Sequence, residues 1–246
     1  MPLSNQSMVS TIKSEIEDII NKNCLNLRLG KLNDIERISN FQKELFNPHN
    51  VTLETDYELF RIIKFGYALL IENIDGEILG CYTTIHYGTK EKVGYGIKLG
   101  VSPKISGHNY AAHLAKYATI LAYENGCTYF RALMSPTNIR SAANVLNHVG
   151  YYCEEFHRNI PSFGTRFEIT LPLNQNTFFN TEINFDKVKE FINDSTIDKD
   201  FVLFSPHEID KIETAYLQTK FKIIAYLKKG LIDNNDYFFA IELTSP

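Results

Sequence analysis

Cysteine is scarce in this sequence, and its placement is unlike that of a zinc site. Structural zinc sites commonly use pairs of cysteines separated by two residues. This chain contains no Cys-x-x-Cys pair, and its four cysteines are widely spaced, at Cys24, Cys81, Cys127 and Cys153. We therefore expect reduced, partly buried thiols, and we predict no metal-binding residues.

Long apolar runs and a strong excess of one charge are also missing. No apolar run approaches the ~18 residues that span a bilayer, and residues 1–20 lack the continuous apolar core of a secretory signal. The 25 basic and 29 acidic residues give a net charge of −4, which argues against broad affinity for nucleic acid or anionic membranes. We expect a soluble, cytoplasmic protein without a nucleic-acid or membrane partner.

The residues that are present predict a mixed α+β protein. With 246 residues, 44% of them hydrophobic, the chain can bury one substantial core and a smaller one. Helical and strand-like patterns follow one another without strict alternation, which predicts a mixed sheet flanked by helices. We expect helices at residues 10–23, 34–46, 56–65, 110–125 and 139–149, and strands at 25–29, 67–74, 77–87, 93–101, 128–134 and 151–158.

Three of these strands form an expected antiparallel meander. Residues 67–74, 77–87 and 93–101 are rich in β-branched and aromatic side chains, and Asp75-Gly76 is a two-residue hairpin signal between the first two. The segments therefore pair in sequence order.

The third of these strands, 93–101, is unusual because glycine recurs along it. Strict alternation places Gly94, Gly96, Lys98 and Gly100 on one face of the sheet and the odd-numbered residues 95–101 on the other. Repeated glycines indicate that a helix, another backbone or a ligand approaches closely. Helix packing is the favoured explanation for Gly94 and Gly96, whereas Gly100 is expected to border a ligand or a bulge.

The segment after this strand has the features of an anion-binding junction. Pro103 stops ladder pairing, Gly107 and Asn109 tolerate left-handed backbone angles, and the small Ala111 and Ala112 open a helix. Such a junction exposes unpaired N–H groups at the positive end of a helix dipole, which suits a phosphate or pyrophosphate. The same residues also fit a turn that merely bends the chain.

The order of motifs from Gly100 to Tyr152 resembles the acetyl-CoA-binding half of the GNAT superfamily of N-acyltransferases. In that family a strand ending in Val-x-Pro leads to an Arg/Gln-x-x-Gly-x-Gly/Ala turn, whose amides hold the pyrophosphate of coenzyme A. This chain has Val101-Ser102-Pro103, a turn at 106–111, then Asn138 and Gly150-Tyr151 in the same order. The resemblance extends over Leu25–Leu173 and implies a GNAT-like fold.

The resemblance implies an acyl-CoA cosubstrate and an amine acceptor that is a small molecule or a protein. A homodimer is an alternative that comes from the C-terminal segment and not from the resemblance. Backbone N–H groups near Leu99 and Val101 would hold the oxyanion, where a bulge splays the family's strand. Asn138 would position the pantetheine arm or a water, although it also suits a helix start. The remaining cofactor-binding positions would be Ser106, Gly107, His108, Asn109, Tyr110 and Ala111.

Two positions in the turn depart from the family pattern. Ser106 stands where the family usually has Arg or Gln, and Asn109 stands where it usually has Gly. One charge-assisted or amide contact is therefore missing. These changes predict weaker coenzyme A binding, or a shift towards another pantetheine-bearing donor such as an acyl carrier protein.

The catalytic residues are less well defined by the resemblance. Family members often protonate the leaving thiolate with a Tyr on the last helix, but Leu146 occupies that position here, with His148, Tyr151 and Tyr152 nearby as substitutes. The candidate bases are His86 and Glu91, near where the family binds acceptors. Each also has a structural interpretation, as an edge histidine and as a solvated turn charge.

The sequence predicts three domains: a helix and tail at 1–24, a GNAT-like domain at 25–173, and a small βαββ extension at 174–246. The extension is expected to give structural support, with cover for the acceptor site or a dimer interface as alternatives. Its expected elements are a leading helix at 185–194, strands at 200–204, 221–230 and 236–243, and a helix at 207–218.

Three functions remain open at this point. The first is an N-acyltransferase that moves an acyl group from coenzyme A to an amine. The second is a non-catalytic protein of the same fold that binds acyl-CoA or a partner, which the missing Tyr would permit. The third is an N-acyl amino acid or acyl-homoserine lactone synthase type that uses long acyl chains.

Overall fold

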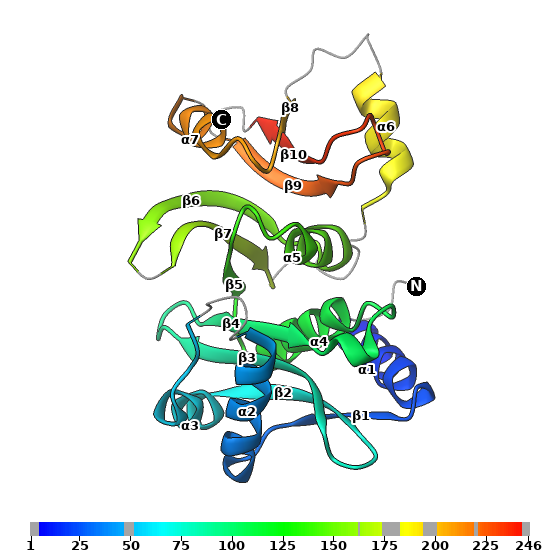
Figure 1. Ribbon diagram of the computed structural model, residues 1–246, viewed down its shortest axis with the longest axis vertical. Coiled ribbons are helices and arrows are strands. Elements are labelled where there is room, and N and C mark those ends of the chain that lie inside the picture. Colours follow the sequence, from blue (N-terminus) through cyan, green and yellow to red (C-terminus); the bar gives the residue numbers. More distant parts are fainter. Residues whose placement is uncertain are drawn as a thin grey trace. The chain divides into compact units, whose positions relative to one another are not determined.

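The computed structural model describes residues 5–46, 52–161, 163–173, 183–193, 201–218 and 221–242 (Figure 1). The chain divides into two compact units. One comprises Met1–Arg131 and Pro172–Phe179, and the other comprises Ala132–Leu171 and Asn180–Pro246. The predicted domain boundaries at 24/25 and 173/174 stay a prediction.

The first unit is built on an antiparallel meander, as the sequence predicted. The strands β1 to β4 pair in sequence order, and the turn between β2 and β3 contains Gly76 at a φ of +78°. Glycine adopts this left-handed angle without steric cost, which explains the Asp75-Gly76 signal. The strands are β1 (Leu25–Leu29), β2 (Gly66–Asn73), β3 (Ile78–Tyr87) and β4 (Val93–Val101).

Helices cover both faces of this meander. Ala68 and Leu70 of β2 pack with Ile38 of α2 and Leu59 of α3 on one face. On the other face, Leu114 of α4 lies against Gly80. Because both faces are covered, β2 is buried almost throughout instead of alternating between buried and exposed. The helices are α1 (Asn5–Lys22), α2 (Ile35–Phe46), α3 (Asp56–Phe65) and α4 (Tyr110–Glu124).

Local signals account for the helix starts. Thr55 Oγ1 accepts a hydrogen bond from Glu58 N at 3.2 Å, and the Glu58 carboxylate accepts from Thr55 N at 2.7 Å. This reciprocal pair is a capping box, which satisfies two backbone donors at the start of α3. Helix α1 begins earlier than predicted, and it buries Ile16 and Ile20.

The second unit contains the predicted βαββ extension. Its strands pair in the order β7-β6-β9-β10-β8, and the segment β8-α7-β9-β10 reproduces the expected pattern. Positions 174–182 and 194–200 of the extension lie outside the described residues. The elements are β6 (Tyr152–Ile160), β7 (Gly164–Pro172), α6 (Phe185–Asn193), β8 (Phe201–Phe204), α7 (Ile209–Gln218), β9 (Phe221–Leu227) and β10 (Tyr237–Glu242).

The helix predicted at 139–149 is not one regular α-helix. It begins as α5 (Ile139–Ala142) and continues as a π-helical segment, η4 (Ala143–Val149), which ends at Gly150 with a φ of +84°. Within η4, the side-chain amide of Asn147 donates to Tyr226 O at 2.8 Å and accepts from Tyr226 N at 2.9 Å. This amide therefore pairs with the backbone of β9 as a neighbouring strand residue would.

Strand β5 (Tyr129–Met134) begins in the first unit and ends in the second.

Among the helices of the described residues, none combines the length and apolar character that a membrane crossing requires. The α+β fold class is confirmed.

Candidate active site

Strand β4 is distorted before it reaches the predicted anion-binding turn. Thr84 of β3 pairs with Gly96 and Thr83 pairs with Lys98, so Ile97 is an extra residue in β4. Such a β-bulge reverses the alternation of side chains beyond it. The predicted strand alternation is therefore wrong past Ile97, because one inserted residue exchanges the faces.

The surroundings of the glycines confirm this exchange. A Cβ atom on Gly94 would lie 2.8 Å from Ala122 Cβ of α4, whereas one on Gly100 would lie 2.4 Å from Leu45 Cδ2 of α2. Helix packing thus explains Gly94, as predicted. The expectation that Gly100 borders a ligand or a bulge is wrong, because α2 fills the space and the bulge lies three residues earlier.

Gly96 has a different neighbour from the one predicted. A Cβ atom there would lie 2.0 Å from Tyr82 Oη, so the glycine accommodates a ring from β3 rather than a helix. Burial raises the pKa of Tyr82, which keeps this phenol protonated.

The strand ends as its sequence predicted. Ser102 N donates to Leu79 O at 2.7 Å, and Pro103–Ile105 then form a single 3₁₀ turn. Ser102 Oγ accepts from Lys104 N at 3.3 Å, and Ser106 N donates to Pro103 O at 3.2 Å. Because proline cannot donate to a ladder, the chain leaves β3 at this point.

The turn that follows contains the two left-handed residues that the sequence predicted. Gly107 has a φ of +100°, and Asn109 has φ +53° and ψ +27°. A Cβ atom on Gly107 would meet no atom within 4 Å. Glycine is therefore favoured there by the backbone angle and not by crowding. Residues 106–109 are all exposed, so the turn is open to solvent.

Helix α4 starts with its backbone donors available. The first hydrogen bond of the helix runs from His113 N to Asn109 O at 3.0 Å, and the Asn109 side chain makes no capping bond. Among the described residues, no backbone hydrogen bond engages the N–H groups of Tyr110, Ala111 and Ala112. These amides and the positive end of the helix dipole can hold an anion.

The side chains of the turn divide into exposed and buried. His108 is exposed, with its ring centroid 5.5 Å from that of Tyr110. Tyr110 is only 3% exposed, and burial raises the pKa of its phenol. Tyr110 therefore anchors the first turn of α4, whereas Ser106 and His108 face solvent.

The other predicted cofactor-binding residues lie in two places. Leu99 and Val101 are half-buried on β4 and pair with Tyr82 and Gly80 of β3. Asn138 belongs to the second unit, where its Oδ1 accepts from Ser141 N at 3.1 Å at the start of α5. The helix-starting role considered for Asn138 is thus confirmed, and its cofactor role stays a prediction.

The predicted bases lie at the opposite end of β4 from the turn. His86 pairs with Gly94, seven residues before Val101, which corresponds to about 20 Å of strand. Glu91 is exposed in the connection between β3 and β4. The structure therefore brings neither residue together with the amide-lined turn.

His86 nevertheless has a distinctive environment. Its ring contacts Tyr67 edge to face at 5.3 Å, and among the described residues its buried Nε2 has no hydrogen-bond partner. Burial and the charge of Lys92 lower the pKa of His86. The neutral imidazole, which can accept a proton, is therefore the favoured form at neutral pH.

An ion pair at the bulge was not predicted from the sequence. Lys98 Nζ lies 3.1 Å from Glu54 Oε2, and Glu54 Oε1 accepts from Thr83 Oγ1 at 3.2 Å. Both charged side chains are at most 10% exposed, and Lys98 Nζ lies 5.5 Å from the ring centroid of Phe46. A lysine inside an apolar strand was the only sequence sign of this pair.

The position of the family's general acid is filled by an apolar side chain. Leu146 is fully buried in η4, and Tyr151 is 1% exposed. Lys222 Nζ lies over the ring of Tyr152, 3.4 Å from the ring centroid, and His148 is half-buried. All four residues belong to the second unit.

The bulged strand β4 leads through the left-handed turn to the start of α4, and together they form a strand-to-helix junction lined by backbone amides. Residues 32–151 match the model of the Acetyltransferase (GNAT) family. This match confirms, for these residues, the resemblance to the GNAT superfamily seen in the sequence. No curated protein matches the chain.

Solved structures share the fold at low sequence identity. Naa50 from Arabidopsis thaliana, in complex with a bisubstrate analogue, is 14% identical with a TM-score of 0.51, covering 60% of this chain and 97% of that chain. Ard1 from Thermoplasma volcanium is 12% identical with a TM-score of 0.52, covering 62% and 99% respectively. A mutant form of the spermidine/spermine N-acetyltransferase SpeG from Vibrio cholerae is 12% identical with a TM-score of 0.51, covering 64% and 98%. At these identities the likeness concerns the fold.

Proposed function

We propose that this protein transfers an acyl group from acyl-CoA to an amine. The observation that carries the proposal is the exposed turn with left-handed Gly107 and Asn109, followed by three backbone amides at the start of α4. Those amides suit the pyrophosphate of coenzyme A. The complex of Naa50 with a CoA-containing analogue and the polyamine acetyltransferase SpeG support the donor and acceptor classes.

The reaction can proceed without a general acid at Leu146. The amine nitrogen attacks the thioester carbonyl, a C–N bond forms, the C–S bond breaks, and the amine loses a proton. A thiol of pKa ~8.5 leaves as a thiolate more readily than an alcohol leaves as an alkoxide. Backbone N–H groups of β4 near Leu99 and Val101 would stabilise the oxyanion.

The proton acceptor is a choice among His86, Glu91 and Glu54, and His86 would act through a chain of waters because it pairs with Gly94, seven residues before Val101. The lowered pKa of His86 supports a role as base, and Glu91 is exposed to solvent. Glu54 lies beside the bulge, where it forms an ion pair with Lys98. A bell-shaped pH–rate profile whose acidic limb is lost in His86→Gln would support His86, because a base must lose its proton before it can act, whereas an unchanged profile would exclude it.

The acceptor is proposed only by class, as a small-molecule or protein amine. Cytoplasmic location and a homodimer are part of the same proposal. Thiol release measured for the full chain against panels of acyl-CoA donors and amines tests the activity and assigns the acceptor.

Two substitutions at one position test the amide-lined turn. Gly107→Ala and Gly107→Asp carry the same strain at a φ of +100°, so a difference between them reports charge. At ~4–5 Å in water, one carboxylate and one phosphate charge repel by about 1 kcal/mol. The Asp variant should therefore bind acyl-CoA at least about fivefold more weakly than the Ala variant. Equal affinities by calorimetry would mean that the turn only bends the chain.

A non-catalytic acyl-CoA-binding role is the second candidate function. The fully buried Leu146 at the family's general-acid position supports it. Donor binding without thiol release across the amine panel would establish this role. Turnover restricted to long-chain donors would instead favour the N-acyl amino acid or acyl-homoserine lactone synthase type.

A further inference from the structure

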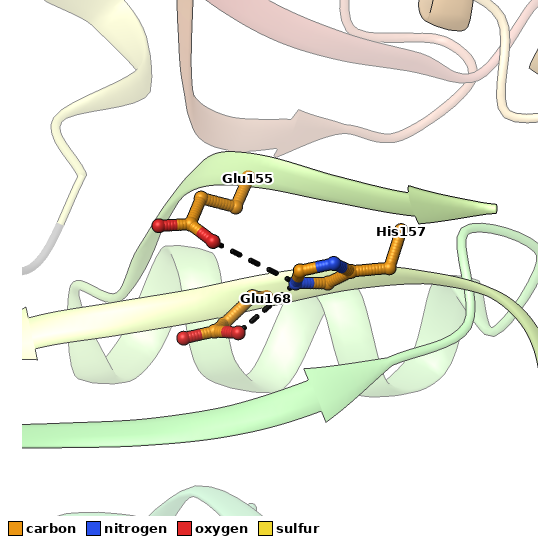
Figure 2. Close-up of side chains that lie close together, drawn as sticks. All are labelled: Glu155, His157 and Glu168. Atoms are coloured by element: carbon orange, nitrogen blue, oxygen red, sulfur yellow. Dashed lines mark hydrogen bonds and ion pairs between the residues drawn. The ribbon is translucent and has the colours of Figure 1, made fainter. Parts of the chain in front are cut away.

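Three side chains that can ligate a metal converge on one face of the β6–β7 hairpin. Figure 2 shows the Nε2 edge of His157 directed at the carboxylates of Glu155 and Glu168. Glu155 and Glu168 lie directly opposite each other on the two strands, and His157 follows two residues after Glu155 on the same face. All three residues belong to the second unit.

A break in the strand register creates this arrangement. Cys153 pairs with Ile169, and the next pair is Glu155 with Glu168, so Glu154 is an extra residue in β6. In a regular hairpin, Glu154 would have faced Glu168, and Glu155 and His157 would have pointed to the opposite face. The bulge therefore determines which carboxylate and which imidazole join Glu168.

The spacing of the three atoms suits a common ion. His157 Nε2 lies 3.0 Å from Glu168 Oε2 and 3.7 Å from Glu155 Oε2, and all the ligand atoms lie within 4.8 Å of one another. Ligand atoms bound at about 2.1 Å stand roughly 3.0 Å apart around an octahedral ion and roughly 3.4 Å apart around a tetrahedral one. Adjustments of a few tenths of an ångström would bring both distances to His157 within that range.

One imidazole is shared between two carboxylates in this cluster. One imidazole nitrogen carries at most one hydrogen, so Nε2 can donate fully to only one of the two carboxylates. Directly opposed like charges destabilise a strand pair, and Glu168 is only 16% exposed. Arg166 lies opposite His157, and its Nη1 donates to Thr165 O at 2.7 Å.

We propose that Glu155, His157 and Glu168 form a binding site for a divalent transition-metal ion of the zinc class. An imidazole nitrogen with two carboxylate oxygens suits zinc and its neighbours, whereas magnesium and calcium prefer oxygen ligands alone. Three protein ligands leave a further position for water. The ion would join β6 to β7, and this role is independent of the proposed acyl transfer. Strand pairing brings these three side chains together, so the spacing of cysteines in the sequence gives no sign of the site.

Calorimetric titration of the full, tag-free chain with Zn²⁺ tests the site. Because exposed Cys24 is a competing ligand, the measurement uses a Cys24→Ser background. We expect one ion per chain, with Glu168→Gln and His157→Gln each weakening binding at least about tenfold, as loss of even an outer-shell partner does. Glu190→Gln, at an exposed carboxylate on α6, is the matched control and should leave the affinity unchanged.

Co²⁺ provides a second readout, because its visible absorption reports coordination by the protein. The absorption of bound Co²⁺ should disappear in Glu168→Gln and persist in Glu190→Gln. If a substitution within the hairpin prevents folding, Glu155→Gln decides the question, because this side chain is exposed. Failure of Zn²⁺ to saturate the chain at ~1 mM, or an unchanged affinity in folded Glu155→Gln and His157→Gln, would overturn the proposal.

Discussion

Replacing Asp34 by asparagine should destabilise the first unit in a pH-dependent way. The buried Asp34 carboxylate accepts hydrogen bonds from Arg28 Nη1 at 2.7 Å, Arg28 Nη2 at 2.8 Å, Arg37 Nη1 at 2.6 Å and Lys31 N at 2.8 Å. The hydrogen bonds from Arg28 are the main cause that lowers the pKa of Asp34 to about 2. The charged carboxylate is therefore preferred in the folded state.

The size and the sign of the effect follow from this pKa. An ordinary Asp titrates at 3.8, and each pKa unit corresponds to 1.36 kcal/mol, so the preference contributes about 2 kcal/mol to the free energy of unfolding. Because the folded pKa is lowered, the contribution is complete above about pH 4 to 5 and is lost as pH falls towards 2. Burial raises the pKa of neighbouring Glu72, but hydrogen bonds from Arg28 and Arg37 outweigh burial and lower it overall.

Urea unfolding of the wild type and Asp34→Asn at pH 7 and pH 3 measures this contribution. We expect Asp34→Asn to be less stable by about 2 kcal/mol at pH 7, with a smaller difference at pH 3. Asp18→Asn, at an exposed position on α1, is the control and should change little at either pH. A deficit of equal size at both pH values would refute the reasoning, because it would reflect lost packing instead of charge.

Three further substitutions test other parts of the structure. Ser106→Arg should strengthen acyl-CoA binding, and calorimetry at two ionic strengths should show the gain shrinking with salt. Asn147→Ala should lower the free energy of unfolding in urea by at least about 2 kcal/mol, because it leaves the buried backbone groups of Tyr226 without partners; a loss below ~0.5 kcal/mol would contradict this. Gly100→Val should cost about 1–3 kcal/mol through its clash with Leu45, and unchanged thermal unfolding would count against the packing.

Local chemistry made much of the candidate site predictable. Glycine and asparagine at positions 107 and 109 predicted left-handed backbone, and the structure has it at both. Pro103 predicted the end of strand pairing, and β4 ends two residues before it. These signals depend on the residue itself and its immediate neighbours, so they can be recognised in one sequence.

The strand bulges could not be predicted in the same way. Residues 93–101 read as regular alternation, but the pairing of Thr83 and Thr84 with β4 skips Ile97 and moves Gly100 to the α2 face. The site at Glu168 likewise depends on a skipped Glu154. Register arises between strands and is decided by which side chains each face can bury.

Long-range partners also changed the roles of predicted residues. Asp34 is the first residue of the helix predicted at 34–46, and its carboxylate accepts from Lys31 N and binds Arg28 of β1. Glu54 and Lys98 are 44 positions apart and meet only in the folded chain. Such pairs leave no local pattern.

The pairing of Asn147 with Tyr226 bears on how the chain can be shortened. Asn147 lies within the segment that matches the GNAT family, and Tyr226 lies in β9 of the extension. A chain cut after Leu173 would leave the buried amide of Asn147 without its partner and would remove β9 from the side of β6. An uncovered strand edge invites pairing with other chains. A fragment that ends at Leu173 would therefore be prone to aggregate, and crystallisation or assay requires the extension.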